Sequence, residues 1–474
     1  MTFLLQNVLI PNGDRYAQVD IQMTQRLHAI APAQSSALND FEQNRTVVNA
    51  TDKLLLPGFV NGHTHSSQIW QRGLVRPLPL ELWLADVYDA APKLSLEELY
   101  LGALSTAIDT VMSGGTCVMD HVLLAFGQEA ESMAAIVKAY REVGLRAFIA
   151  PLIMDQPMLA GLPRGRSLPH APYPRSTQAI LEIMTELIEQ FHDPAAGIQV
   201  AVGPTGFHRC SDELLLGCAA LSDRYHLCRH AHLLETKAQK LLAAEKYGMS
   251  AVAHLHQLGF LDHRTSLAHG VWLDEHDLTI LATTRSTLVH NPVSNLRLGS
   301  GIAPVLKGLQ AGVNISFGCD GAASNDAQDL LEVIKLSTIL HTITDADYQH
   351  WLTPRQAIGM AALGGAKGVN LADETGSLEV GKAADVVLYD LTQLSMLPCT
   401  DPIQLLVLGR PTQVIDSVWV NGRRIVADGA LLTVDIEALR QELLARSRGD
   451  RHDQFQTIHQ IEPHYRTLLT QAML

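Results

Sequence analysis

The sequence has few aromatic and few charged residues for its length. Of the 474 residues, 5% are aromatic and 18% are charged, whereas 47% are hydrophobic. The chain is too long for one small core, and its apolar content is high enough to bury a large one. We therefore expect a barrel-sized domain accompanied by a smaller one.

Basic residues are scarce relative to acidic ones. The chain has 35 Lys and Arg against 49 Asp and Glu, a formal net charge of −14, and no long run of like charge. Surfaces that bind nucleic acids or anionic membranes need clustered Lys and Arg, so we expect neither partner. No apolar run approaches the length of a membrane span.

The cysteines are few and form no CxxC pair. The six stand at 117, 210, 218, 228, 319 and 399, a scatter typical of reduced, buried thiols in a chain of this size. The N-terminus lacks the basic start and small-residue cleavage site of a signal peptide, and it is more typical of a first strand and turn. Both observations favour a cytoplasmic protein.

Strand and helix patterns alternate along the middle of the chain. Apolar strands are expected within 54–68 and then in TCVMDHV, LRAFIAPLIM, IQVAVGPT, LCRHAHLL, SLAHGVW, STLVHNP and NISFGCD. Helical sequence follows each strand, beginning with a Ser95–Glu98 capping box and a helix to about residue 113. Eight such units predict a (β/α)8 TIM-type barrel over 57–375. The rival, an open doubly wound sheet, would carry a Gly-rich phosphate turn after its first strand, and none is present.

The two ends of the chain carry strands that need a partner. Residues 1–56 are strand-like but cannot bury a core alone. Residues 376–434 contain further strands and the hairpin signal Asn421-Gly422. We therefore predict one small composite β-sandwich domain formed by both ends, and a polar C-terminal helical arm over 435–474.

Polar residues that ligate metals stand at the ends of the predicted strands. His63 and His65 close the stretch 54–68, two positions apart and thus on the same side of a strand. Later strands end in His232 with Glu235, His269 and Asp320, and parallel barrel strands present such ends at one face. Three imidazoles and a carboxylate suit Zn²⁺ or Fe²⁺ with water in an open position.

One histidine in a barrel layer is more often a hydrogen-bonded core residue, and His230 and His290 fit that interpretation. The joint placement is what is specific. The motifs GFVNGHTH, HLLET, LAHG, HNPVSNLRLGSG and GCDGAASND together resemble the amidohydrolase superfamily. They are most similar to its mononuclear-metal aminohydrolases, which include cytosine, guanine, 8-oxoguanine, pterin and S-adenosylhomocysteine deaminases and triazine hydrolases.

The resemblance implies a role for each residue. His63, His65, His232 and Asp320 would bind one divalent metal ion per chain, with Zn²⁺ favoured and Fe²⁺ the alternative. Glu235 would be the proton shuttle, and His269 would hydrogen-bond the activated water or the substrate. Asp320 would also accept a proton from that water. The strand IQVAVGPT has no lysine to be carboxylated, which argues against a two-metal site.

Fewer residues point to the substrate. Gln68 stands where oxo-purine and pterin deaminases of the family carry a glutamine, and an amide suits a lactam edge. Thr205 occupies the place of a histidine found in nucleoside-type deaminases, with His208 close by. Trp83 is expected either to wall the pocket or to pack a loop. The loop 155–175, with Arg164, Arg166, His170 and Tyr173, is a lid or a plain surface loop.

These features predict a metal-dependent hydrolase that deaminates an amino-substituted nitrogen heterocycle, with oxo-purine- or pterin-like substrates favoured. Two alternatives within enzymes remain: displacement of chloride or alkylamine from a triazine-like ring, and deamination of S-adenosylhomocysteine or adenosine. The non-enzymatic alternative is a catalytically silent barrel scaffold. A homo-oligomer is expected from the resemblance.

Overall fold

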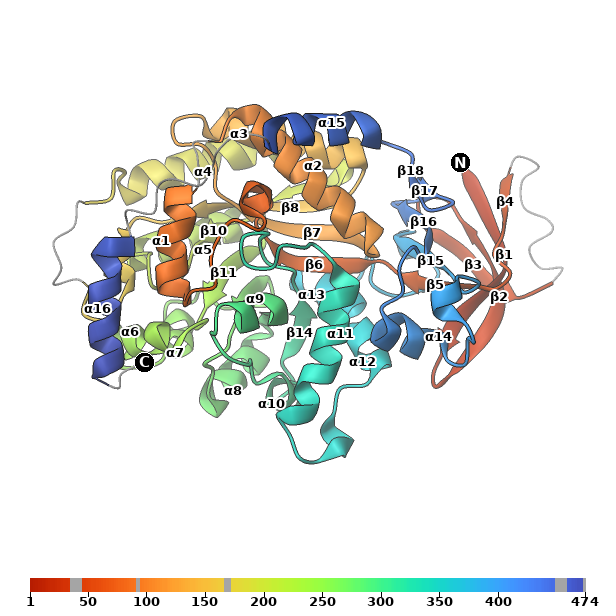
Figure 1. Ribbon diagram of the computed structural model, residues 1–474. Helices are drawn as coiled ribbons and strands as arrows, with labels where there is room; N and C mark the ends of the chain where they lie inside the picture. Colours follow the sequence, from red (N-terminus) through yellow and green to blue (C-terminus); the bar gives the residue numbers. More distant parts are fainter. Residues whose placement is uncertain (35–44, 91–93, 166–171, 448–457, 472–474) are drawn as a thin grey trace.

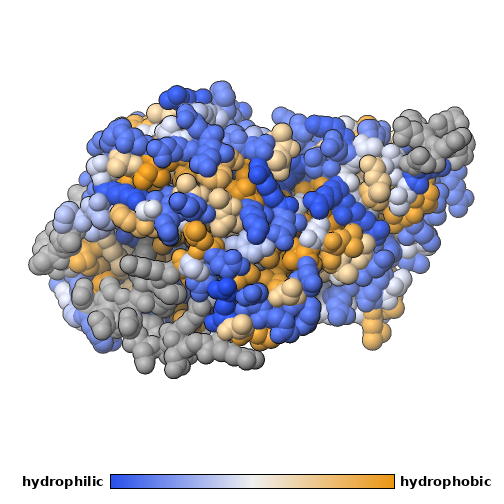
Figure 2. Space-filling view, turned by 90° about the horizontal axis from the view of Figure 1, so that it is seen from above, coloured by the Kyte–Doolittle hydropathy of each residue, from blue (hydrophilic) through white to orange (hydrophobic). Residues whose placement is uncertain are grey.

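The computed structural model describes residues 1–34, 45–90, 94–165, 172–447 and 458–471 of the chain (Figure 1). Figure 2 shows a face on which hydrophilic residues surround smaller hydrophobic patches. Within the described residues, no helix combines the length and apolar character that crossing a membrane requires.

Parallel strands form a closed barrel in the middle of the chain. They are β6 (Phe59–Thr64), β7 (Gly115–Val122), β8 (Arg146–Ile153), β9 (Ile198–Val200) with β10 (Gly203–Pro204), β11 (Arg229–Leu233), β12 (Thr265–His269), β13 (Thr287–His290) and β14 (Asn314–Phe317). They hydrogen-bond as two partial sheets, β6 to β10 and β11 to β14. A parallel bridge from Val202 to Arg229 joins the partial sheets on one side. The Asp320 N–H donates to the His63 carbonyl at 2.9 Å on the other. The predicted barrel is confirmed.

Helices cover the outside of the barrel (Figure 1). The principal ones are α2 (Leu96–Met112), α3 (Glu129–Val143), α4 (Thr177–Phe191), α5 (Asp212–Tyr225), α6 (Lys237–Tyr247), α7 (Ala251–Gln257), α8 (Glu275–Thr284), α9 (Pro292–Arg297), α10 (Val305–Gln310) and α11 (Leu330–Leu340). The capping box of Ser95 with Glu98 opens α2 as predicted. Gly144, in the left-handed region, ends α3.

Strands from both chain ends form one nine-stranded sheet. They are β1 (Thr2–Asn12), β2 (Arg15–Met23), β3 (Leu27–Pro32), β4 (Arg45–Asn49), β5 (Lys53–Pro57), β15 (Val386–Asp390), β16 (Ile415–Val420), β17 (Arg423–Ala427) and β18 (Ala430–Leu431). The Phe3 and Trp419 rings, on β1 and β16, lie 5.7 Å apart although β15 and β5 separate these strands in the sheet. The sheet therefore folds onto itself around a shared core, as expected for a small sandwich. The residue bounds of the domains stay a prediction.

Two local expectations after residue 54 need correction. The stretch to His65 is not one strand, because β5 belongs to the small sheet and β6 to the barrel. Gly58 joins them, and a Cβ there would lie 2.1 Å from the Thr116 hydroxyl, so only glycine fits this close approach. Trp83 was also expected to pack a loop as one alternative, but it lies in a helix, α1 (Leu80–Ala90).

The C-terminal segment contains the helices α15 (Ile436–Ser447) and α16 (Ile458–Thr470). Figure 1 shows α15 over α2 and α3, and α16 beside α1 at the other end of the barrel. Ile458, Ile461 and Tyr465 of α16 are buried against Leu82 and Ala85 of α1. The second helix therefore supports a segment that borders the site described next.

Candidate active site

The predicted site residues meet at one cavity. Its volume is about 840 Å³, and its wall includes all but one of them: His65, Gln68, Trp83, His208, His232, Glu235, His269 and Asp320. The exception, His63, is completely buried behind this wall. The loops after the strands therefore build the cavity, as in other barrels of this type.

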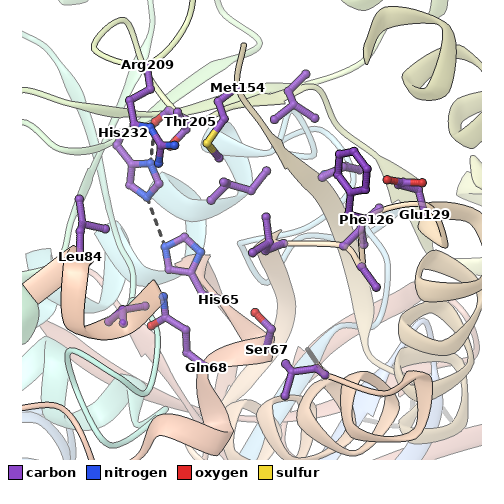
Figure 3. A pocket seen from close by; sticks show the side chains of 18 of the residues that line it. His65, Ser67, Gln68, Leu84, Phe126, Glu129, Met154, Thr205, Arg209 and His232 are labelled. Atoms are coloured by element: carbon purple, nitrogen blue, oxygen red, sulfur yellow. Dashed lines mark hydrogen bonds between the residues drawn. The ribbon is translucent and has the colours of Figure 1, made fainter. Parts of the chain in front are cut away.

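Asp320 Oδ1 and the Nε2 atoms of the three predicted histidine ligands lie near one another. Asp320 Oδ1 lies 3.5 Å from His63 Nε2 and 3.4 Å from His65 Nε2. His232 Nε2 lies 3.2 Å from His65 Nε2, an approach marked by a dashed line in Figure 3. His63, His65 and Asp320 therefore form one metal-sized group, and His232 joins it through its approach to His65.

The backbone determines which nitrogens carry hydrogen. The Nδ1 of His65 donates to the His121 carbonyl, and the Nδ1 of His232 donates to the Thr205 carbonyl at 2.7 Å. A carbonyl only accepts, so each Nδ1 carries a hydrogen, and the neutral form of each ring then presents its Nε2 lone pair towards the other ring. Two lone pairs this close to each other and to a carboxylate suit a divalent cation, and the residues present fit such an ion.

His63 is supported from behind by a second histidine. Its Nδ1 lies 2.7 Å from His230 Nε2, and His230 Nδ1 lies 2.7 Å from the Ser266 hydroxyl. Its Nε2 is buried and has no hydrogen-bond partner among the described residues. Burial lowers the pKa of His63 to about 4, so the ring is neutral, as a ligand must be. His230, predicted as a core residue, is one that supports a candidate ligand.

Two buried carboxyl groups in the cavity have opposite protonation preferences. Burial raises the pKa of Glu235 well above its usual range, and Asp320 and Glu81 add to this effect. Burial also acts to raise the pKa of Asp320, but the imidazoles of His63, His269 and His65 outweigh it and hold this pKa well below its usual range. A pair separated in this way is typical of an acid and a base with distinct tasks.

His269 lies between the two carboxyl groups. Its Nε2 is 3.6 Å from Glu235 Oε2 and 4.0 Å from Asp320 Oδ2, and its Nδ1 is 2.9 Å from the Asn295 amide oxygen. Asn295 therefore orients this ring. It belongs to the motif HNPVSN, from which no role for it was predicted.

Three strand ends of the site have backbone in the left-handed region. His269 and Asp320 have φ angles of 77° and 60°, and Leu234, directly before Glu235, has a φ of 42°. Residues other than Gly rarely adopt this left-handed backbone conformation. Each residue held in it lowers the free energy of unfolding by an amount on the order of 1–3 kcal/mol. Strain at three neighbouring turns fits a site whose side-chain directions are held by the surrounding fold.

The predicted substrate residues also reach the cavity. Gln68 accepts a hydrogen bond from the Ala323 N–H at 3.4 Å, which leaves its amide NH₂ as a donor. Trp83 lines the cavity from α1 and donates to the Ala323 carbonyl at 3.3 Å. His208 lines it too, and burial lowers its pKa to about 3.

The loop 155–175 contributes part of the wall. Tyr173 and Arg175 line the cavity, and Arg175 pairs with Glu129 at 2.5 Å. Figure 3 shows Glu129 and Phe126 on the far side of the cavity from His65 and His232. Arg166 and His170 lie outside the described residues.

Some residues of the site were missed. His121 can join His63 and His232 in a second metal-sized cluster. Arg209 lines the cavity close to Thr205 (Figure 3). A row of apolar residues on α4 adds Ile180, Ile183, Met184 and Leu187. Apolar spacing on α4 predicts a buried face, but not that part of this face borders a cavity.

Comparisons with known proteins agree with this geometry. The model of the Amidohydrolase family matches residues 54–425. A 5'-deoxyadenosine deaminase of Methanothermobacter thermautotrophicus is 33% identical over 392 residues, 81% of this chain and 85% of that protein. A 5-methylthioadenosine/S-adenosylhomocysteine deaminase of Syntrophobacter fumaroxidans is 31% identical over 437 residues, 92% of this chain and 94% of that protein.

Solved structures share the fold over nearly the whole chain. An adenosine deaminase from Xanthomonas campestris with bound zinc superposes with a TM-score of 0.82 at 26% identity, covering 94% of this chain and 98% of that one. An atrazine chlorohydrolase from Arthrobacter aurescens complexed with zinc has a TM-score of 0.84 at 23% identity, which shows the shared fold, and the alignment covers 94% of this chain and 100% of that one. The chain therefore belongs to the amidohydrolase family and is a hydrolase of carbon–nitrogen bonds that uses a divalent metal.

Proposed function

We propose that the protein hydrolyses the amino group from a ring carbon of a 5'-substituted adenine nucleoside, releasing ammonia. The observation that carries the reaction type is the pair Glu235 and Asp320. Both border one cavity, next to the ring nitrogens of His65 and His232, and they have opposite protonation preferences.

The nucleoside is favoured over the smaller substrates by two observations. The cavity of about 840 Å³ is several times larger than a single purine base requires, and its far wall is largely apolar. The two relatives described above, both more than 30% identical, are named as deaminases of adenine nucleosides with altered 5' positions.

The candidate ligands His63, His65, His232 and Asp320 would hold one divalent ion, which we propose to be Zn²⁺. Such an ion lowers the pKa of a bound water from about 15.7 towards 7 and so supplies a nucleophile at neutral pH. The carbonyls of His121 and Thr205 accept hydrogen bonds from the Nδ1 atoms of His65 and His232. These bonds orient both rings so that their Nε2 atoms can face the ion.

The remaining steps belong to side chains of this chain. Asp320 accepts the proton that water loses as its oxygen adds to the ring carbon. Glu235, protonated because it is buried, donates its proton to the adjacent ring nitrogen and then takes up the remaining proton of the added hydroxyl. Asp320 gives the proton that it accepted to the departing amine, which leaves as ammonia. His269, whose Nε2 lies 3.6 Å from Glu235 Oε2, forms a hydrogen bond with the reacting oxygen or with the substrate. Water and the amino compound are thereby converted into the oxo compound and ammonia.

A second substrate class has support from the wall near the metal ligands. The Gln68 amide presents donors to the cavity, and Arg209 places a cation close to Thr205. Both suit the oxo edge of an oxo-purine or a pterin. Thr205 itself replaces the histidine expected for nucleoside-type deaminases.

The test is ammonia release from a panel of amino-heterocycles, including 5'-deoxyadenosine, S-adenosylhomocysteine, guanine and a pterin. We expect the nucleosides to have the highest kcat/KM. Higher values for the oxo-purine or pterin would favour the second class, and no release by the metal-loaded protein would favour a silent scaffold.

Two variants separate proton transfer from metal binding. Glu235→Gln is expected to lose at least about a hundredfold in turnover while keeping its metal, because general acid–base help is typically worth about 10²–10⁴-fold. His232→Ala is expected to lose the metal itself. Metal content measured beside turnover decides, and loss of the ion from Glu235→Gln would reassign Glu235 as a ligand or its support.

A further inference from the structure

A buried carboxyl group on α1 contacts the turn that carries Glu235. Glu81 is only 5% exposed and does not line the cavity. The Thr236 hydroxyl donates to Glu81 Oε1 at 2.5 Å, across 155 positions of sequence. Because Thr236 directly follows Glu235, this contact ties α1 to the strand end with the proposed proton shuttle.

The contact continues back to Glu235 itself. The Thr236 hydroxyl accepts from the Gln239 N–H at 3.3 Å and so caps α6. The Gln239 side-chain oxygen then accepts from the Glu235 N–H at 2.9 Å. One sequence of hydrogen bonds therefore runs from Glu81 through Thr236 and Gln239 to the backbone of Glu235.

Glu235 needs this support. Among the described residues no hydrogen bond holds its carboxyl group, and the nearest ring nitrogen, His269 Nε2, is 3.6 Å away. The residue before it, Leu234, has a φ of 42°, a conformation that persists only where its surroundings hold it. The direction of the carboxyl group therefore depends on how the turn is fixed.

Helix α1 is itself held on two sides. Leu80, Trp83, Leu84 and Val87 line the cavity, while Leu82 and Ala85 pack against α16. Trp83 also contacts the loop after Asp320 through the Ala323 carbonyl. Glu81 is thus on the cavity-bordering helix, at the point where this helix touches the turn after β11.

We propose that Glu81 is a positioning residue, which acts through Thr236 to fix the direction of the Glu235 carboxyl group. The seating of α1 over the cavity is thereby coupled to proton transfer. This inference rests on the proposed function, in which Glu235 moves protons.

Substitutions that remove the contact test the inference. Glu81→Leu and Thr236→Val are expected to lower kcat by about tenfold or more, since a small misplacement of a catalytic group is costly. The KM and the metal content should stay near those of the wild type. Glu81→Gln and Thr236→Ser keep the acceptor and the donor, and both should retain kcat. The double variant Glu81→Leu, Thr236→Val should be no slower than the slower single variant.

A control separates the contact from helix capping. Ser250 caps the neighbouring α7 through the Ala253 N–H, so Ser250→Ala removes a cap without touching α1 and should leave kcat unchanged. Thr236→Val reports on the same contact if Glu81→Leu does not fold. Unchanged kcat in both Glu81→Leu and Thr236→Val, or a loss in Glu81→Gln as large as in Glu81→Leu, would overturn the inference.

A second measurement does not require turnover. Hydrogen exchange of the Glu235 amide, which donates to Gln239, should be about tenfold faster in Glu81→Leu than in wild type and unchanged in Glu81→Gln. If the wild type releases no ammonia from any substrate, the proposed function fails while exchange still decides on the contact. Equal exchange in Glu81→Leu and wild type shows that Glu81 does not fix this turn.

Discussion

At the scale of single residues, burial decides which carboxyl groups keep a proton. Glu81 shows this outside the cavity wall, since burial raises the pKa of its carboxyl group and the hydrogen bond from Thr236 offsets only part of that effect. The folded protein therefore binds a proton at Glu81 at a pH where the unfolded chain has released it.

This raised pKa predicts a pH dependence of stability. A group whose pKa is higher in the folded state contributes stability that is present below its unfolded value, near 4.5 for Glu81, and is lost as the pH rises through the folded value. Glu81→Gln has no such proton to lose. We therefore expect the difference in Tm, variant minus wild type, to become more positive between about pH 5 and pH 8. Thermal unfolding at several pH values checks this, and a constant difference would contradict it.

At the scale of elements, helices outside the barrel determine what the cavity admits. The strand ends supply the reacting groups, whereas α1 and α4 supply much of the apolar wall. On α4, Ile180, Met184, Leu187 and Ile188 are buried, and Ile183 is a half-buried residue that borders the cavity. Helix α4 therefore limits the size of the substituent that the cavity can accept.

Narrowing the cavity at α4 should change substrate preference. Ile183→Trp is expected to lower kcat/KM by about tenfold or more for a nucleoside with a large 5' substituent, because a single misfitting group in an apolar pocket is worth about 1–3 kcal/mol. Turnover of a small free base should change little. Glu186→Trp, on the exposed side of α4, is the matched control and should affect neither substrate. An equal loss for large and small substrates would remove α4 from the substrate site.

At the scale of the whole molecule, the proposed metal site joins the two partial sheets of the barrel. His63 and His65 follow or end β6 of one partial sheet, whereas His232 is on β11 and Asp320 follows β14 of the other. An ion held by all four would therefore connect strands that do not share one hydrogen-bonded ladder. The cytoplasmic location and homo-oligomeric assembly stay predictions from the sequence.

Removal of the metal should therefore lower the stability of the barrel. An ion that binds only the folded state stabilises it by about 2.7 kcal/mol at a concentration 100 times its Kd. We expect about one divalent ion per chain by elemental analysis, and a lower Tm after chelation that is restored by Zn²⁺. His232→Ala should show no such response. Two equivalents at the site, or the same Tm with and without the ion, would contradict the proposed single site.

The sequence alone determined the order of strands and helices, and the residues at the strand ends. Hydrophobic periodicity, helix caps and terminating glycines are local signals, so the start of α2 at its Ser95 cap could be predicted. The ends of parallel strands lie together in a barrel, so the meeting of His63, His232 and Asp320 also followed from the pattern.

Only the tertiary structure decided how those residues are supported. His230 reaches His63 across 167 positions, and Thr236 reaches Glu81 across 155. No local period encodes such contacts, because they exist only once the barrel has closed and α1 has packed across it. The contact between Gly58 and Thr116 is also tertiary. It forms where the chain passes from the small sheet into the barrel.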